Sequence, residues 1–305
     1  MPHDTAHRPG TAVMLMIAAS ALIAGTTLLA KALSAPDYGT PLHPFQITFG
    51  RFVFAFLGIA TAAALLRPRL VRPDLRLHVL RTTAGATGVT LMFAAVAYIP
   101  LADATAISFL NPVFAMLLAI PLLGERVGPW RWAAAGIALA GALVLLRPTP
   151  DSFQPAALLA LGAALIMGFE ITVIKILSGR EPPFSILLVN NAIGVCIASA
   201  AVIWVWQTPT AAQWAMMAGV GLLMASAQAC FVNAMARAEA SFVVPFSYIT
   251  LVFAAVYDFA IFAVIPDAVT ALGAAIIIAG GALLAWREGR AGMTQPRPCN
   301  SAAHD

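Results

Sequence analysis

Charged side chains are scarce in this chain. Asp, Glu, Lys and Arg make up 10% of its 305 residues, whereas the apolar types make up 61% and the mean hydropathy is +0.89. A soluble globular domain has about 25% charged residues, because its surface faces water. So few charges cannot cover a soluble surface, which argues against a large soluble α-helical protein with an apolar core.

Reactive and metal-binding residues are also sparse. The three cysteines, Cys196, Cys230 and Cys299, are an odd and scattered set that fits neither a disulfide framework nor a metal site. We find no nucleophile, metal set or His/Asp cluster of the kind that a membrane enzyme needs. We therefore expect no enzymatic activity and no cofactor or metal. The net charge of +4 concerns orientation in a membrane rather than nucleic-acid binding.

Long apolar runs, in contrast, fill the chain. A helix needs about 20 apolar residues to cross a hydrocarbon core of about 30 Å. Ten segments meet this requirement: 11–33, 44–66, 77–99, 101–123, 129–147, 156–178, 184–206, 212–236, 239–263 and 268–287. They leave only a short head, 1–10, and a polar tail, 287–305, which we expect to be disordered. The sequence predicts an all-α polytopic membrane protein with ten transmembrane helices in a lipid bilayer.

The distribution of Lys and Arg predicts the orientation. Alternate loops place two of these residues, Lys31 and Arg147, on one side. The other side has twelve: Arg8, Arg67, Arg69, Arg72, Arg76, Arg126, Arg131, Arg180, Arg237, Arg287, Arg290 and Arg297. Positive residues stay in the cytoplasm, so both termini are expected inside, in the inner membrane of a bacterial cell.

The two halves of the chain resemble each other. Four stretches of residues 11–147 match stretches of 156–286 in the same order: 28–34 with 173–178, 44–52 with 183–191, 102–112 with 238–248, and 134–147 with 273–287. Five helices per copy would make the second copy enter from the opposite side. Such inverted-topology repeats are typical of secondary transporters, which bind substrate near the midplane and alternate between two packings of the halves.

Particular motifs extend this pattern. They are "GRF" at 50–52, "YIPLADATAISFLNPVFAMLLAIPLLGER" at 98–126, the spacing of Trp132, Gly136 and Gly141, "AEASFVVPFSYITLVFAAVYDFAIFAVIPD" at 238–267, and "GAAIIIAGGALL" at 273–284. On these residues the chain resembles the drug/metabolite transporter superfamily, specifically the ten-helix EamA type with two EamA repeats. The likeness covers about residues 11–287.

One departure from this family pattern stands out. The second repeat often carries Gly-Glu before its "PD", where this chain has Ala263-Val264, so Glu125 has no counterpart in the second half. The resemblance implies substrates such as S-adenosylmethionine, riboflavin, amino acids or opine-type metallophores. It leaves both import and export open.

Arg51 is the first candidate for the transport path. It lies seven residues after Pro44, about 10 Å into the membrane at 1.5 Å per residue. It could hold an anionic group of the substrate bidentately, or it could be a structural arginine that bonds backbone carbonyls or extends to the interface. Its counterpart in the second repeat is Asn190, which suggests that both positions face a central cavity.

Two acids are further candidates. Glu170 is the deepest, and it could carry a proton, bind a substrate amine, or form a permanent ion pair with Lys175 or Arg51. Asp258 could pair with Arg51 at a similar depth, bind a cationic group, or be a plain interfacial acid.

Helix breaks supply the remaining candidates. Asn111-Pro112 and Pro245 each lie about one-third into a span, where proline frees a carbonyl that a cavity can re-satisfy. We expect both breaks to line the path, with Ser247 and Tyr248 adding hydrogen bonds. The acids Asp103 and Glu239 are expected only to complement helix dipoles.

These features favour a secondary transporter of a small polar metabolite, coupled to a proton or working by exchange. The mixture of a guanidinium and carboxylates favours export of an amino-acid-derived, opine-like or metallophore-like compound. The alternatives are uptake of riboflavin or S-adenosylmethionine, and a non-transporting receptor or assembly subunit. The sequence leaves the oligomeric state open.

Overall fold

The computed structural model describes residues 9–34, 36–68, 70–96, 98, 104, 107–146, 157–262 and 267–294. Within these ranges the regular secondary structure is helical throughout. The elements are α1 (Pro9–Leu33), η1 (Pro36–Tyr38), α2 (Pro44–Leu66), α3 (Leu75–Val96), α5 (Asn111–Leu123), α6 (Pro129–Leu146), α7 (Ala157–Arg180), α8 (Pro183–Val202), α9 (Ala211–Arg237), α10 (Ala240–Val243), η3 (Val244–Tyr248), α11 (Ile249–Phe262) and α12 (Ala268–Thr294).

Each of the ten predicted segments contains one of these helices or, in the ninth, the series α10, η3 and α11. Six stretches are long and apolar enough to cross a membrane: Pro9–Ala30, Pro44–Leu66, Ala157–Arg180, Pro183–Val202, Ala211–Arg237 and Ala240–Ile261. The all-helical, polytopic class is therefore confirmed. The count of ten spans stays a prediction, because other helices are shorter or less apolar.

Helix ends follow local chemistry. Pro44 opens α2, and the side chain of His43 accepts a hydrogen bond from the N–H of Phe45. Thr210 and Gln213 form a reciprocal capping box at the start of α9. At the other end of the chain, α12 runs to Thr294. Part of the tail that was expected to be disordered is thus helical, since Glu288, Arg290 and Ala291 are good helix formers.

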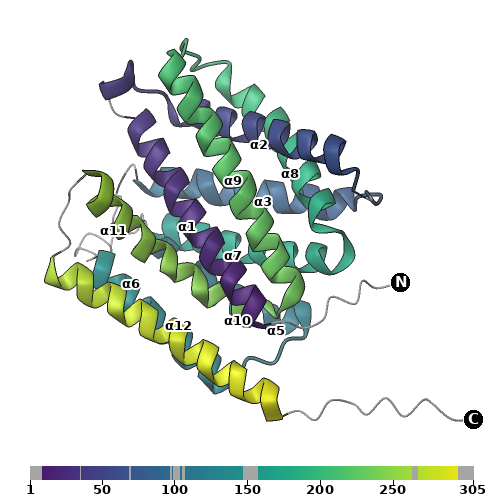
Figure 1. The fold of residues 1–305 in the computed structure, drawn as a ribbon, viewed down its shortest axis with the longest axis vertical. Coiled ribbons are helices and arrows are strands. Elements are labelled where there is room, and N and C mark those ends of the chain that lie inside the picture. Colours follow the sequence, from purple (N-terminus) through teal and green to yellow (C-terminus); the bar gives the residue numbers. More distant parts are fainter. Residues whose placement is uncertain are drawn as a thin grey trace, which may run out of the picture.

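The two halves of the chain interleave. The most extensive helix contacts pair α1 with α9, α6 with α12, α3 with α7, α5 with α7, and α2 with both α8 and α9. In Figure 1, α1 and α9 run side by side through the middle, and α12 lies along α6 at one edge. Each of these pairs joins one helix from the first half to one from the second. Neither half can bury its helix faces without the other.

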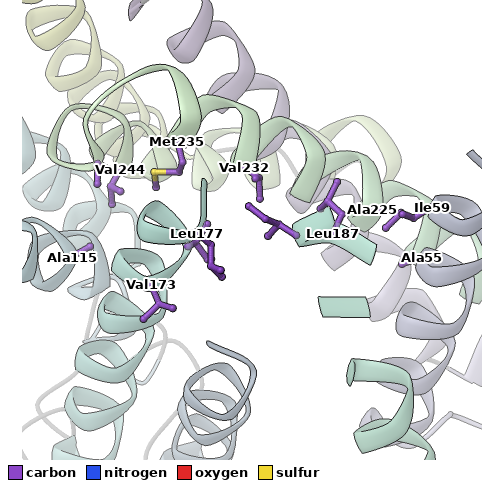
Figure 2. Packing of buried hydrophobic residues seen from close by; sticks show 13 residues of the cluster. Ala55, Ile59, Ala115, Val173, Leu177, Leu187, Ala225, Val232, Met235 and Val244 are labelled. Carbon is purple, nitrogen blue, oxygen red and sulfur yellow. The ribbon is translucent and has the colours of Figure 1, made fainter. Parts of the chain in front are cut away.

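The largest apolar cluster shows this interleaving at the level of side chains. It brings Leu177 of α7 and Leu187 of α8 toward Val232 of α9, while Ala225 of α9 packs near Ile59 of α2 (Figure 2). All five side chains are less than a tenth exposed. These small and branched side chains allow α7, α8 and α9 to pack around one core.

The α6–α12 pair depends on a glycine from each helix. A Cβ added at Gly141 would lie 2.8 Å from the backbone O of Gly273, and one at Gly280 would lie 3.0 Å from the O of Ala134. These positions are counterparts in the repeat, so the crossing is nearly symmetric. Gly136, on the same helix, has open space where its Cβ would be and does not contribute to this crossing.

We predict that Gly141→Val lowers the melting temperature of the detergent-purified protein by an amount equivalent to about 1–3 kcal/mol, because the added atoms would meet backbone. Gly136→Val is the matched control on the same helix and should change the melting temperature little. Equal melting temperatures for the two variants would show that the close crossing is unnecessary.

Candidate functional site

Arg51 lies on α2 and is half-buried. Its guanidinium lies over the ring of Phe52, 4.3 Å from the ring centre. It interacts electrostatically with Glu170 and with a second arginine, Arg81. Its Nε is buried and makes no hydrogen bond within the described part of the chain. Nε of Arg51 therefore bonds no backbone carbonyl among the described residues, and the choice between a substrate-binding and a structural arginine stays open.

Arg81 lies on α3 and is only 3% exposed. Its Nε is 3.8 Å from Oε1 of Glu170, close enough for an ion pair but too far for a hydrogen bond. Neither Nε nor Nη1 of Arg81 has a hydrogen-bond partner among the described residues. A buried guanidinium with unused donors is uncommon, because each unpaired group costs free energy.

Glu170 supplies the negative charge opposite the two arginines. Its side chain, on α7, is a quarter exposed, which makes it the most accessible member of the Arg81–Glu170 pair. Gly85 of α3 allows the approach: a Cβ there would lie 3.0 Å from Oε2 of Glu170. Gly85 follows Arg81 by four residues and so shares its helix face. The absence of a side chain at Gly85 lets the carboxylate lie beside Arg81.

This cluster of Arg51, Arg81 and Glu170 joins the two halves of the chain. Both arginines belong to the first half, and the glutamate belongs to the second. An ion inside an apolar bundle needs a partner of opposite charge, since desolvation is expensive. Here one carboxylate faces two guanidiniums.

Of the other charged partners that were expected for the cluster, Lys175 lies elsewhere. Lys175 donates instead to the backbone oxygens of Met235, at 2.7 Å, and Ala238, at 2.5 Å. It thereby satisfies carbonyls at the end of α9, so the expected Lys175–Glu170 alternative was wrong. The side chain of Asp258 lies outside the described residues, and its pairing with Arg51 remains a prediction.

Both predicted proline breaks are present. α5 begins at Asn111, with Pro112 in its first turn, and Pro245 lies in the short η3 between α10 and α11. Tyr248, at the end of η3, donates a hydrogen bond of 2.7 Å to the carbonyl oxygen of Phe109 and stacks on its ring. The two breaks are thus joined directly. Tyr248 is fully buried, so a solute would reach it only after this contact opens.

The remaining predicted residues lie around this centre. Asn190 is buried on α8, and Ser247 is half-buried in η3. The backbone oxygen of Asn111 packs against Gly168, where an added Cβ would come within 2.9 Å of it. Gly168 precedes Glu170 by two residues on α7. No hydrogen bond within the described ranges connects Asn111, Asn190 or Ser247 to the charged cluster, so their part in a transport path stays a prediction.

Glu125, which has no counterpart in the second half, contacts the start of α10. Its two carboxylate oxygens accept hydrogen bonds from the N–H groups of Ala240, at 2.8 Å, and Ser241, at 2.9 Å. It therefore caps the first turn of α10 from across the repeat boundary. Beside it, Arg131 of α6 forms an ion pair with Glu239 and donates a hydrogen bond to Ser241.

Polar contacts join the halves at both ends of the bundle. At one end, the buried Gln46 of α2 exchanges two hydrogen bonds with the backbone of Gln207. At the other end, Glu181 accepts a hydrogen bond from the N–H of Asp74 at 2.7 Å and lies 3.0 Å from Nε2 of His78. One contact uses neutral amides, whereas the other uses titratable groups.

The sequence interpretation missed Arg81. The signal was available, since Arg81 falls inside the predicted span 77–99, and an ionisable residue in a span is a candidate for a functional site, as Arg51 is. It was overlooked because Arg72 and Arg76 precede it closely and make the start of the segment resemble a loop. His78 and Gly85 were also not predicted, because their partners are distant in sequence.

The sequence of this chain is similar to that of known proteins. The model of the EamA-like transporter family matches residues 10–147 and again residues 154–286. The chain belongs to the EamA-like transporter family. It is therefore a multi-pass membrane protein of a transporter family, as the sequence motifs indicated.

Its relatives carry different names. A protein named riboflavin transporter from Rhizobium johnstonii is 35% identical over 70% of this chain and 71% of its own length. A protein named S-adenosylmethionine uptake transporter from Rickettsia bellii is 26% identical over 83% of this chain and 87% of its own. A protein named pseudopaline exporter from Pseudomonas aeruginosa is 26% identical over 87% and 93%. One crystal structure shares the fold, with a TM-score of 0.75 and 22% identity, over 91% of this chain and 98% of its own.

We predict that Glu170→Gln destabilises the protein by about 3 kcal/mol, because it leaves two guanidiniums in the bundle without their counter-ion. The double variant Glu170→Gln/Arg81→Met should recover part of that loss. Thermal unfolding in detergent measures both. Glu239→Gln is the control, since the side chain of Glu239 is 40% exposed and its loss should cost at most about 1 kcal/mol. A double variant less stable than Glu170→Gln alone would contradict the pairing.

Proposed function

We propose that this protein is a secondary transporter that moves a small polar metabolite across the bacterial inner membrane by alternating access. The observation that carries the proposal is the cluster of Arg51, Arg81 and Glu170. Its charges come from both halves of the chain, and it lies within a bundle whose largest core cluster is apolar. In folds with two repeats, a site between them is exposed to one side at a time as the repeats change packing.

We infer that the end with Glu125, Arg131 and Glu181 faces the cytoplasm. The support is the excess of Lys and Arg in the loops on that side. Both termini are then cytoplasmic, and Gln46 lies near the outer surface. The ten helices, grouped as 11–147 and 156–286, form the two inverted repeats of this proposal.

Export of an amino-acid-derived or opine-like compound is the first candidate for direction and substrate. It is supported by the mixture of guanidiniums and a carboxylate, which suits a zwitterionic or anionic metabolite. The relative named pseudopaline exporter agrees with this direction. Uptake of riboflavin or S-adenosylmethionine is the second candidate, favoured by the names of other relatives and, for riboflavin, by the 35% identity.

A proton is the coupling ion that the cluster favours. Glu170 is partly exposed and can change its protonation as its access alternates, whereas the arginines remain charged. Exchange of one metabolite for another would leave Glu170 charged throughout. Asn111, Asn190, Ser247, Tyr248 and Asp258 are proposed to line the path, with the breaks at Pro112 and Pro245.

The first test is metabolite profiling of a deletion strain against strains restored with the wild type or with Arg51→Ala. For an exporter, we expect a solute to accumulate inside the deletion strain and to be cleared by the wild type but not by Arg51→Ala. Depletion of the solute in the deletion strain would instead indicate uptake.

Membrane abundance of each variant must be equal for this comparison. If Arg51→Ala then behaves as the wild type, Arg51 is structural and not part of the path. Purified protein that moves none of the candidate solutes in liposomes, under any imposed gradient, would favour a receptor or assembly subunit.

A further inference from the structure

The charges of the cluster do not balance. Arg51 and Arg81 contribute two positive charges, and arginine stays protonated in proteins. Glu170 contributes at most one negative charge, and it interacts with both arginines. No other acidic side chain within hydrogen-bonding or ion-pairing distance of the two guanidiniums is seen among the described residues. Among the described residues the cluster therefore carries one more positive charge than negative charge.

Some hydrogen-bond donors of the two arginines also lack acceptors. Nε of Arg51 and both Nε and Nη1 of Arg81 are buried donors without an acceptor in the part of the chain that the structure describes. Guanidinium groups offer donors in a planar fork that matches the paired oxygens of a carboxylate or phosphate. The missing partner is thus an acceptor with two or more oxygens and a negative charge.

The two side chains of the ion pair differ in exposure. The side chain of Arg81 is only 3% exposed, whereas that of Glu170 is 25% exposed. The carboxylate is therefore the more accessible of the two groups. The close approach of Gly85 to Glu170 also means that movement of α3 against α7 shifts the carboxylate relative to Arg81.

We propose that Arg51 and Arg81 form an oxyanion-binding site, in which a carboxylate or phosphate group of the substrate shares the two guanidiniums with Glu170. This inference deepens the transporter proposal and rests on it. It selects substrates that carry an ionised acid. S-adenosylmethionine meets the requirement through its carboxylate, whereas riboflavin, which is uncharged at neutral pH, does not.

Two pairs of probes isolate the anionic group. Riboflavin and riboflavin 5′-phosphate differ by one phosphate, and S-adenosylmethionine differs from its decarboxylated form by one carboxylate. Binding of each probe to the purified full-length protein can be measured by ligand-induced thermal stabilisation. We expect at least one acidic member to bind about tenfold or more tightly than its partner, as a charge-assisted hydrogen bond implies. The pair that responds distinguishes a phosphate from a carboxylate.

The variants assign the effect to the arginines. Arg81→Gln and Arg51→Gln should each remove the preference for the acidic member, whereas Arg81→Lys should keep part of it, because lysine retains the charge but not the fork. Arg180→Gln is the control, since Arg180 is 62% exposed and lies at the end of the bundle. It should leave the preference unchanged.

Flux in liposomes separates this proposal from transport itself. Transport of riboflavin that is equal for the wild type and both glutamine variants would keep the transporter and overturn the oxyanion site. The oxyanion site would also be overturned if neither acidic probe bound the wild type more tightly than the non-acidic probe of its pair. If none of the four probes crosses the membrane but the acidic probes still bind more tightly in a way that needs the arginines, the oxyanion site is supported. The same result contradicts transport of these compounds.

Discussion

Pairing of helices between the two halves is the interaction on which the rest of the structure depends. The extensive helix contacts, from α1 with α9 to α6 with α12, each join one half to the other. In a bilayer, association of helices relies on close packing and polar contacts, because lipid is as apolar as the side chains. Gly141 and Gly280 provide such packing at one edge, and the cluster around Leu177 provides it at the centre.

Polar side chains also hold the helices together. Lys175 bonds the end of α9, Glu125 caps α10, and Gln46 bonds the backbone of Gln207, each with its partner satisfied. Arg51 and Arg81 differ from these residues, because Nε of Arg51 and both Nε and Nη1 of Arg81 have no partner among the described residues. Ser20, His78 and Arg287 each have one such atom, whereas the two arginines gather three of them around one carboxylate. Unsatisfied buried polar groups in a native structure call for a specific explanation, and a bound ligand is the one proposed above.

The sequence predicted the helices well and the site only in part. Hydropathy predicted the all-helical, polytopic class, since runs of about twenty apolar residues leave a strong signal, and proline marked both breaks correctly. Arg51 and Glu170 were selected because each is an ion in an apolar run. The packing of α3, α7 and α9 determines that these two residues lie near Arg81. It also determines that Lys175 bonds carbonyls at the end of α9 instead of Glu170. Such contacts between residues 60 or more positions apart leave no periodic pattern in one sequence.

Glu125 has a consequence for the balance between the two access states. Its carboxylate ties α10 to the end of α5, and the second repeat has Val264 at the equivalent position, so the same tie cannot form at the opposite end of the molecule. In the proposed alternating-access cycle, two packings that a perfect inverted repeat would make equal in energy would therefore be unequal. A difference of about 1.4 kcal/mol is a tenfold ratio of populations. A single unmatched carboxylate could thus set the resting orientation of the protein.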